Sequence, residues 1–246
     1  MQRVGLIGGT GWPATRDYYE QINRLVHKRL GGLHSANLLI WSFDFQEVLD
    51  KVNVPGAMDQ QFLSAGIALQ AAGAQVLALA SNTGHLFVKA WQPADLPLVH
   101  IAEVCARSLA QAGVTRVGIL ATQLACQGGV FTSHFAAAGI ALVYLNAKLA
   151  QSLDDAIFGE LETGAPGLLT HDALIQAAKY FTDQGVHEVL LGCTELRLSL
   201  MPEEIRVATQ SGQSAIRFWD STDIHCAAIV DAALQPSAQV TQTKQK

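Results

Sequence analysis

Short runs of apolar residues alternate along the chain with longer amphipathic stretches, and this alternation predicts a parallel α/β fold. The runs are apolar at consecutive positions, as in strands that are buried on both faces. We predict strands at 4–7, 38–41, 76–80, 98–101, 117–120, 140–145, 188–191 and 215–219. We predict helices from Trp12 onward and at 60–72, 103–111, 129–138, 152–161, 171–184 and 224–234. An order of this kind is typical of doubly wound parallel sheets.

The first predicted helix follows a glycine-rich turn at 8–11. Pro13 lies in its first turn, where proline is tolerated because the N–H is not needed. Tyr18, Tyr19, Ile22 and Val26 are spaced to form one apolar face, so we expect all four to be buried.

Two pairs of similar segments are separated by nearly the same number of residues. RVGLIGGT begins at Arg3 and RVGILATQ begins at Arg116, which gives 116 − 3 = 113. Further along, GAQVLALASNTGH and GVHEVLLGCTEL align Ser81 with Cys193, which gives 193 − 81 = 112. Two copies in step indicate an internal duplication.

The duplication predicts two pseudo-symmetric α/β halves. The first half is expected to comprise 1–113 together with the C-terminal helix at 222–234, which returns to it. The second half comprises 114–221, and the polar tail 235–246 is predicted to be disordered. Ligands of open α/β sheets bind outside the carboxyl ends of the strands, so we expect the site in the cleft between the halves.

Cys193 carries the candidate chemistry. It follows an apolar run, and Thr194 and Glu195 then begin a predicted helix that continues through Leu196 and Leu198. The N–H groups of a helix N-terminus favour an anion, so we expect the thiol pKa to lie below about 8.5. Cys193 could then act as a base, a nucleophile or a metal ligand, the alternative being an inert buried cysteine.

Polar residues at the other predicted strand ends are candidate pocket residues. Asp44 and Gln46 follow the second strand, Thr10 lies in the glycine turn, and Thr122 occupies the equivalent place in the second half. The alternative for Asp44 and Gln46 is that they are ordinary loop residues.

Composition excludes several classes of partner. The chain has 246 residues, 50% of them apolar and 15% charged, and its net charge of −5 argues against nucleic acid or an anionic membrane as a partner. It contains no predicted leader and no stretch long enough to span a bilayer. Four cysteines at irregular spacings form no disulfide framework. We therefore expect a reduced, cytoplasmic protein.

Familiar cofactor motifs are missing from the sequence. The glycine turn fits neither the dinucleotide nor the P-loop spacing, and a turn that lets backbone amides approach a small carboxylate is the preferred interpretation. The histidines lack zinc-site spacing, Ser81 is not in a G-x-S-x-G motif although His85 follows it, and no lysine ends a predicted strand. We predict no metal and no cofactor.

Several segments together resemble the aspartate/glutamate racemase family, over nearly the whole chain from Val4 to about Leu234. They are RVGLIGGTGWPATRDYYEQIN, RLGGLHSANLLIWSFDF, SNTGH, GCTEL and FWDSTDIHCAAIV. The resemblance implies a cofactor-independent racemase, expected as a homodimer, that acts on aspartate or glutamate with one acid/base residue per half, Ser81 and Cys193. The substrate contacts that it implies are Thr10, Gln46, Asn82, Thr83, Thr122 and Thr194.

The sequence departs from that family in two places. Most members have a cysteine where this chain has Ser81, and many have a lysine or arginine near Glu162 and Thr163, where the nearest cation here is Lys148. A hydroxyl resembles water with a pKa of about 15.7, against about 8.5 for a thiol, a gap of up to about 10 kcal/mol. Cys193 is therefore the expected base and Ser81 the proton donor. By resemblance the cysteine of the second half handles the L-enantiomer, so L-substrates should be favoured.

Two other functions stay open at this stage. An arylmalonate-type decarboxylase would need only Cys193, because one proton delivery completes its reaction. A dicarboxylate- or amino-acid-binding homologue with weak catalysis would need neither residue as a base.

Overall fold

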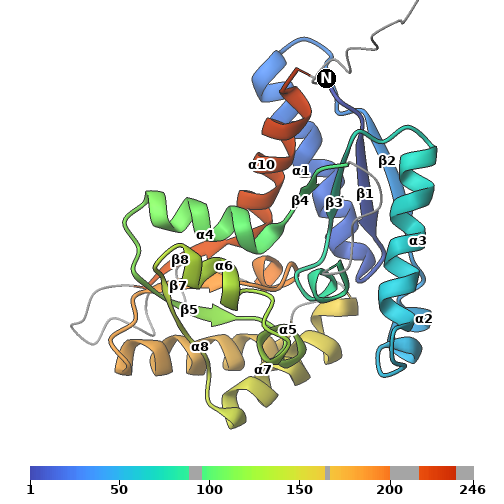
Figure 1. Cartoon of the computed structure of the whole chain (residues 1–246). Helices are drawn as coiled ribbons and strands as arrows, with labels where there is room; N and C mark the ends of the chain where they lie inside the picture. The colour runs from blue at the N-terminus through green and yellow to red at the C-terminus, as the bar shows by residue number, and fades with distance from the viewer. Residues whose placement is uncertain (89–95, 164–166, 200–215, 237–246) are drawn as a thin grey trace, which may run out of the picture.

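Two separate four-stranded parallel sheets form the frame of the protein (Figure 1). The computed structural model describes residues 1–88, 96–163, 167–199 and 216–236. The first sheet has the order β2-β1-β3-β4 and the second the order β6-β5-β7-β8. The strands are β1 (Val4–Gly8), β2 (Leu38–Ser42), β3 (Val76–Leu79), β4 (Leu98–Val99), β5 (Arg116–Leu120), β6 (Ala141–Val143), β7 (Glu188–Leu191) and β8 (Arg217–Asp220). The equivalent orders confirm the predicted fold class of two doubly wound, pseudo-symmetric halves.

Helices cover both faces of the first sheet, which explains why its strands are apolar throughout. Val76 and Ala78 of β3 pack on the side of α1 (Trp12–Leu30) and α10 (Ser221–Leu234). Leu77 and Leu79, which alternate with them, pack on the side of α3 (Ala57–Ala71).

The second sheet is covered in the same way. Val189 and Leu191 of β7 pack with α7 (Ala147–Gly159) and α8 (Leu168–Asp183). Leu190, between them, packs with α4 (Ile101–Gln111) and α6 (Thr132–Ala137) on the other face.

The two halves exchange a helix after their fourth strands. α10 follows β8 of the second sheet but packs on β1 and β3 of the first, and the Gln2 N–H donates to the Ala233 carbonyl at 2.7 Å. The last helix thus packs against the first sheet. α4 follows β4 of the first sheet, yet its buried face packs with β5 and β7 of the second. By packing, α4 thus belongs with the second sheet, although it lies before the boundary predicted at 113.

Two features of helices in the first half differ from the prediction. A short helix, α2 (Phe45–Lys51), was not predicted; Asp44 caps it by accepting from the Gln46 N–H at 3.0 Å. Tyr19 is 54% exposed, so the prediction that it lies on the buried face of α1 is wrong.

In the second half, the helix predicted at 129–138 is the shorter α6, which begins only at Thr132, and the helix before it, α5 (Gln123–Gln127), was not predicted. Gly129, between α5 and α6, has a φ of +77°, which is not a helical conformation, so the helix does not begin there. The predicted tail lies almost entirely outside the described residues, as does most of the connection predicted at 163–167.

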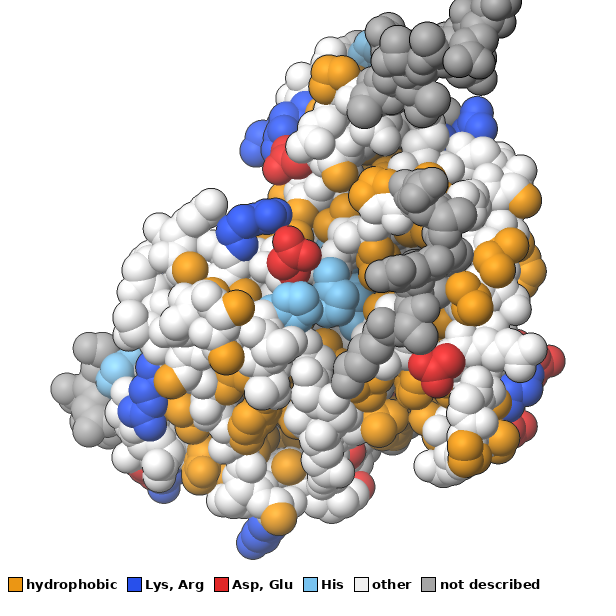
Figure 2. Space-filling model, in the orientation of Figure 1, with side chains coloured by type: hydrophobic (Ala, Val, Ile, Leu, Met, Phe, Trp, Pro, Cys, Tyr) orange, Lys and Arg blue, Asp and Glu red, His pale blue; other side chains and the backbone are white. Residues whose placement is uncertain are grey.

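On the face seen in Figure 2, lysine and arginine side chains are dispersed, while histidine side chains gather near the junction of the two halves. Of the helices in the described ranges, none has both the length and the apolar character needed to cross a membrane.

Candidate active site

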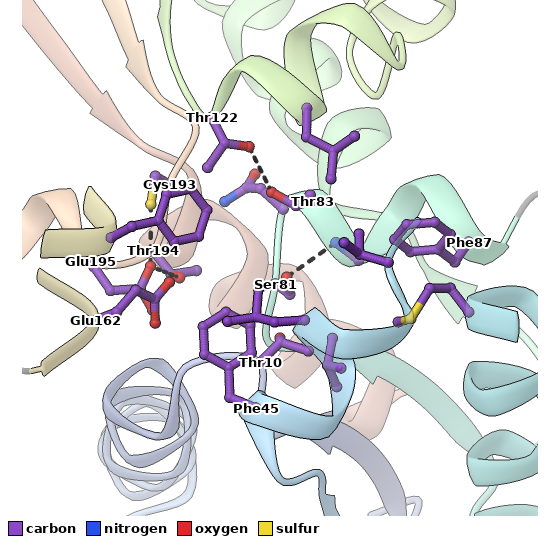
Figure 3. A pocket seen from close by; sticks show the side chains of 18 of the residues that line it. Thr10, Phe45, Ser81, Thr83, Phe87, Thr122, Glu162, Cys193, Thr194 and Glu195 are labelled. Atoms are coloured by element: carbon purple, nitrogen blue, oxygen red, sulfur yellow. Dashed lines mark hydrogen bonds between the residues drawn. The ribbon is translucent and has the colours of Figure 1, made fainter. Parts of the chain in front are cut away.

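A pocket with a volume of about 610 Å³, part of it open to solvent, lies where carboxyl ends of strands from both sheets converge (Figure 3). Ser81 follows β3 of the first sheet and Cys193 follows β7 of the second, and both line this pocket. Of the other predicted site residues, five also line it: Thr10, Asn82, Thr83, Thr122 and Thr194. The structure therefore brings together residues that are far apart in the sequence.

The glycine turn positions Thr10. Gly9 and Gly11 have φ values of +83° and +93°, which only glycine adopts readily. A Cβ on Gly9 would overlap the Phe43 backbone, and the Gly9 N–H donates to the Thr15 hydroxyl at 2.8 Å. The turn is thus fixed close to β2, and Thr10 faces the pocket.

Ser81 is held by the 3₁₀ helix that follows it, η1 (Thr83–Val88). Its side chain is 8% exposed, and its Oγ accepts a hydrogen bond from the Gly84 N–H at 3.1 Å. Since the oxygen is used as an acceptor, the hydroxyl hydrogen remains for donation to a ligand.

Polar side chains beside Ser81 link the two halves of the chain. The Thr83 and Thr122 hydroxyls share a hydrogen bond of 2.9 Å across the pocket. The Asn82 amide donates to the Ser221 hydroxyl at 3.1 Å, at the start of α10. Thr122 also caps α5 by accepting from the Ala125 N–H. These contacts fix the separation of the two pocket walls.

Cys193 is a buried thiol that donates to a carboxylate. Its Sγ lies 3.2 Å from Glu195 Oε2, and the Thr194 hydroxyl donates to the same oxygen at 2.6 Å. Burial raises the pKa of the Cys193 thiol well above its ordinary value, and the carboxyls of Glu195 and Glu162 raise it further.

The prediction of a lowered thiol pKa is therefore wrong. Its premise also differs from the structure, because the described residues after Cys193 form a 3₁₀ helix, η3 (Leu196–Ser199), in place of the expected α-helix. One short turn supplies a weak dipole, and burial beside two carboxyls outweighs it.

Glu162 and Glu195 form a buried carboxyl pair that the sequence analysis did not identify. A Cβ on Gly11 would lie 2.6 Å from Glu162 Oε2 and 2.7 Å from Glu195 Oε1, so both carboxyls converge on one point. Burial, with the nearby Glu195, raises the pKa of Glu162 to about 9, and burial also raises the pKa of Glu195. Glu162 therefore holds a proton at neutral pH.

Unsatisfied polar atoms concentrate at the pocket. In the described part of the chain, buried side-chain atoms without a hydrogen-bond partner include Thr10 Oγ1, Asn82 Oδ1, Glu162 Oε2 and Glu195 Oε1, all from residues that line it. Buried polar atoms are normally paired in proteins. Four unpaired oxygens in one pocket thus indicate a site for a ligand that donates hydrogen bonds.

Three residues considered from sequence lie elsewhere. The exposed Gln46 side chain donates to Asp50 at 2.9 Å and does not line the pocket, and Asp44 is the cap of α2. Lys148 is exposed on α7. The predicted role of Gln46 in substrate binding therefore has no support from its position.

Within the described ranges, no group of three or more histidine, cysteine, aspartate or glutamate side chains could hold a metal ion. Cys105 and Cys226 are buried in the cores, and Cys126 lines a different pocket.

Comparisons with known proteins find one matching family model and several similar solved structures. The model described as Asp/Glu/Hydantoin racemase matches residues 7–229. A candidate Asp/Glu racemase from Yersinia pestis is 32% identical, with a TM-score of 0.82 over 96% of this chain and 100% of that one. An aspartate racemase homologue from Pyrococcus horikoshii is 27% identical, with a TM-score of 0.76 over 96% and 100%. Picrophilus torridus aspartate racemase shares the fold at 16% identity, with a TM-score of 0.76 over 95% and 94%.

Proposed function

Because the chain belongs to the Asp/Glu/hydantoin racemase family, we propose that it racemises a small amino acid by moving protons at Cα between Cys193 and Ser81. The observation that carries the proposal is their placement at equivalent strand ends of the two halves, in one pocket. A substrate Cα between them would meet a thiol on one side and a hydroxyl on the other. No cofactor is part of the proposed reaction.

Glu195 is the group that can activate the thiol. The Cys193 thiol already donates to Glu195 Oε2, so transfer of that proton gives a thiolate and a neutral carboxyl without moving either residue. The thiolate then takes the α-proton of the L-substrate, and the electron pair of the C–H bond passes into the carboxylate as an enolate. Ser81 delivers its hydroxyl proton to the opposite face of Cα, which gives the D-enantiomer. Ser81 then regains a proton from solvent and Glu195 releases one, which restores the starting state.

The unpaired oxygens suit the substrate's α-ammonium. Thr10, Asn82, Glu162 and Glu195 present acceptors, and the α-ammonium has three donors. Glu195 lies against the thiol, so an ammonium on Cα would reach it while Cα faces the sulfur. Thr83 and Thr122 use one hydroxyl hydrogen on each other, so the other hydrogen of this pair is the proposed donor to the α-carboxylate, whereas the Thr194 hydroxyl stays on Glu195.

The unequal basicity of the two groups supports a preference for L-substrates. A serine hydroxyl is a far weaker base than a thiol, so removal of a proton on the Ser81 side is the harder direction. Aspartate or glutamate is the substrate that the resemblance predicts.

Exchange of the α-proton in heavy water tests the reaction. Wild type should exchange and invert an L-amino acid. Cys193→Ser should lose both activities for both enantiomers, because no strong base remains. Ser81→Ala should lose inversion while keeping part of the exchange of the L-substrate, because Cys193 can remove and return a proton on one face.

Three outcomes would contradict the proposal. More than a few per cent of wild-type activity in Cys193→Ser would place the chemistry elsewhere. Full inversion in Ser81→Ala would reduce Ser81 to a packing residue. Release of CO2 from a substituted malonate without amino-acid exchange would indicate a decarboxylase.

We also propose that the protein is a cytoplasmic homodimer. Exposed apolar side chains on the edge strand β2, Ile40 at 42% and Trp41 at 41%, offer a surface for a second copy. Size-exclusion chromatography with light scattering should give a molecular mass of twice the chain mass of 26.3 kDa. A mass of one chain at micromolar concentration would refute the dimer.

A further inference from the structure

The pocket has two walls of different chemistry (Figure 3). Cys193, Glu195 and Glu162 lie on one side, and Phe87 of η1 lies on the opposite side. The apolar wall continues over α2 and α3, where its members include Phe45, Val48, Leu49, Val52 and Met58. A substrate that presents its Cα to Cys193 would therefore direct one substituent toward apolar side chains.

The described lining offers no cation. None of the described residues that line the pocket is lysine, arginine or histidine, and its ionisable carboxyls are Glu162 and Glu195. Arg197, on the turn after Cys193, pairs instead with Asp220 and Asp223 at 3.6 and 3.2 Å. Among the described residues, a second carboxylate on the substrate would thus find no partner of opposite charge to replace its lost hydration.

From these two observations we infer that the substrate carries an apolar side chain, as leucine, methionine or phenylalanine does, in place of a second carboxylate. The inference rests on the proposed racemisation. The apolar wall supplies the burial that such a side chain needs, and the carboxyl pair takes the α-ammonium that every amino acid carries.

A cationic side chain is a poorer fit for this geometry. Glu195 Oε2 lies 3.2 Å from the reacting sulfur, so the pair sits beside Cα rather than at the far end of a long side chain. The ammonium of lysine is separated from Cα by four methylene groups and would reach the apolar wall instead. Burial there without a counter-charge is unfavourable.

The test is α-proton exchange in heavy water by the full chain, with L-leucine, L-methionine, L-phenylalanine, L-aspartate, L-glutamate and L-lysine. We expect kcat/KM for the best apolar substrate to exceed that for aspartate and glutamate by at least about 100-fold. Equal or faster exchange of an acidic amino acid, or fastest exchange of lysine, overturns the inference and leaves the racemase proposal intact.

Binding separates failure of the inference from failure of the reaction. Alkylation of Cys193 by iodoacetamide should be slowed by millimolar L-leucine and unaffected by L-aspartate. If no amino acid exchanges, the racemase proposal fails, and this protection still reports which side chain the pocket accepts. Protection by L-aspartate alone would overturn the inference.

Leu49→Arg provides a gain-of-function arm. Leu49 is 38% exposed at the pocket, so an arginine there can place its charge inside without burying it fully. Exchange of L-aspartate or L-glutamate should rise at least 10-fold and that of L-leucine should fall. Ile67→Arg, on the exposed side of α3 and away from the pocket, is the matched control and should change neither.

Lys89 follows η1 directly in the sequence and lies outside the described residues, so it is tested separately. Lys89→Gln should leave the ratio of apolar to acidic exchange unchanged. A loss of acidic exchange in this variant, from a wild type that exchanges acidic substrates well, would identify Lys89 as the missing cation and overturn the inference.

Discussion

Replacement of Glu162 by glutamine should stabilise the fold, increasingly so as the pH rises. The pKa of the Glu162 carboxyl is raised from 4.5 to about 9 in the folded protein. Between these two values the folded state holds a proton that the unfolded state releases, so the unfolding free energy falls as pH rises through this window. Glutamine carries no such proton and has nearly the same shape.

The expected magnitude follows from that window. At pH 7 the cost of keeping the proton is (7 − 4.5) × 1.36, or about 3 kcal/mol, and at pH 5 it is below about 1 kcal/mol. Urea unfolding followed by tryptophan fluorescence at pH 5, 6, 7 and 8 measures the difference between Glu162→Gln and wild type. The stabilisation should grow across that series.

A surface carboxyl serves as the control. Glu47 is 66% exposed and lies 3.9 Å from Lys51, so Glu47→Gln should change the unfolding free energy by no more than about 0.5 kcal/mol at every pH. A difference between Glu162→Gln and wild type that stays constant from pH 5 to pH 8 would refute the reasoning, because the proton would then play no part.

Three other predictions concern the turn, the histidines and the link between the halves. Gly11→Ala should lower kcat at least 10-fold, because its φ of +93° is strained for alanine and its Cβ would press on both carboxyls; unchanged kcat would mean that their position is unimportant. Burial and the neighbouring His85 and His134 lower the pKa of His100 from 6.5 to about 3, so the unfolded state takes up a proton first as pH falls. Wild type should therefore lose about 2 kcal/mol more stability than His100→Gln between pH 6.5 and pH 5 in urea titrations, and equal losses would contradict this. In a double-mutant cycle of Thr83→Val and Thr122→Val, the coupling energy should be about 1 kcal/mol, whereas no coupling would mean that their hydrogen bond is not formed in solution.

The internal repeat made two things predictable from sequence: the fold, and the meeting of Ser81 and Cys193 in one cleft. Its offset aligned Ser81 with Cys193, and parallel strands of equivalent sheets end on the same side, so both residues could be assigned to one cleft. The apolar runs located the strands because strands of a parallel sheet are buried on both faces.

The electrostatics of the site could not be predicted in this way. Glu162 belongs to a short 3₁₀ segment, η2 (Leu161–Thr163), about thirty residues before its partner, and nothing in its local sequence indicates burial. The sign of the thiol pKa depends on that burial, so a local argument from the turn gave the wrong direction. Glu195, in contrast, stood within the Gly-Cys-Thr-Glu motif and could have been considered as the partner of the thiol.

The exchange of α4 and α10 between the sheets has a consequence for synthesis on the ribosome. Strands β1 and β3 leave the ribosome early, but α10, one of the two helices that cover one of their faces, is made only after all of the second sheet. Domains that fold as contiguous units can form in order as they emerge. Here α1 can cover part of that face early, but the core around Val4, Leu6 and Val76 is complete only when α10 arrives, so the first sheet to be translated is the last to be fully covered.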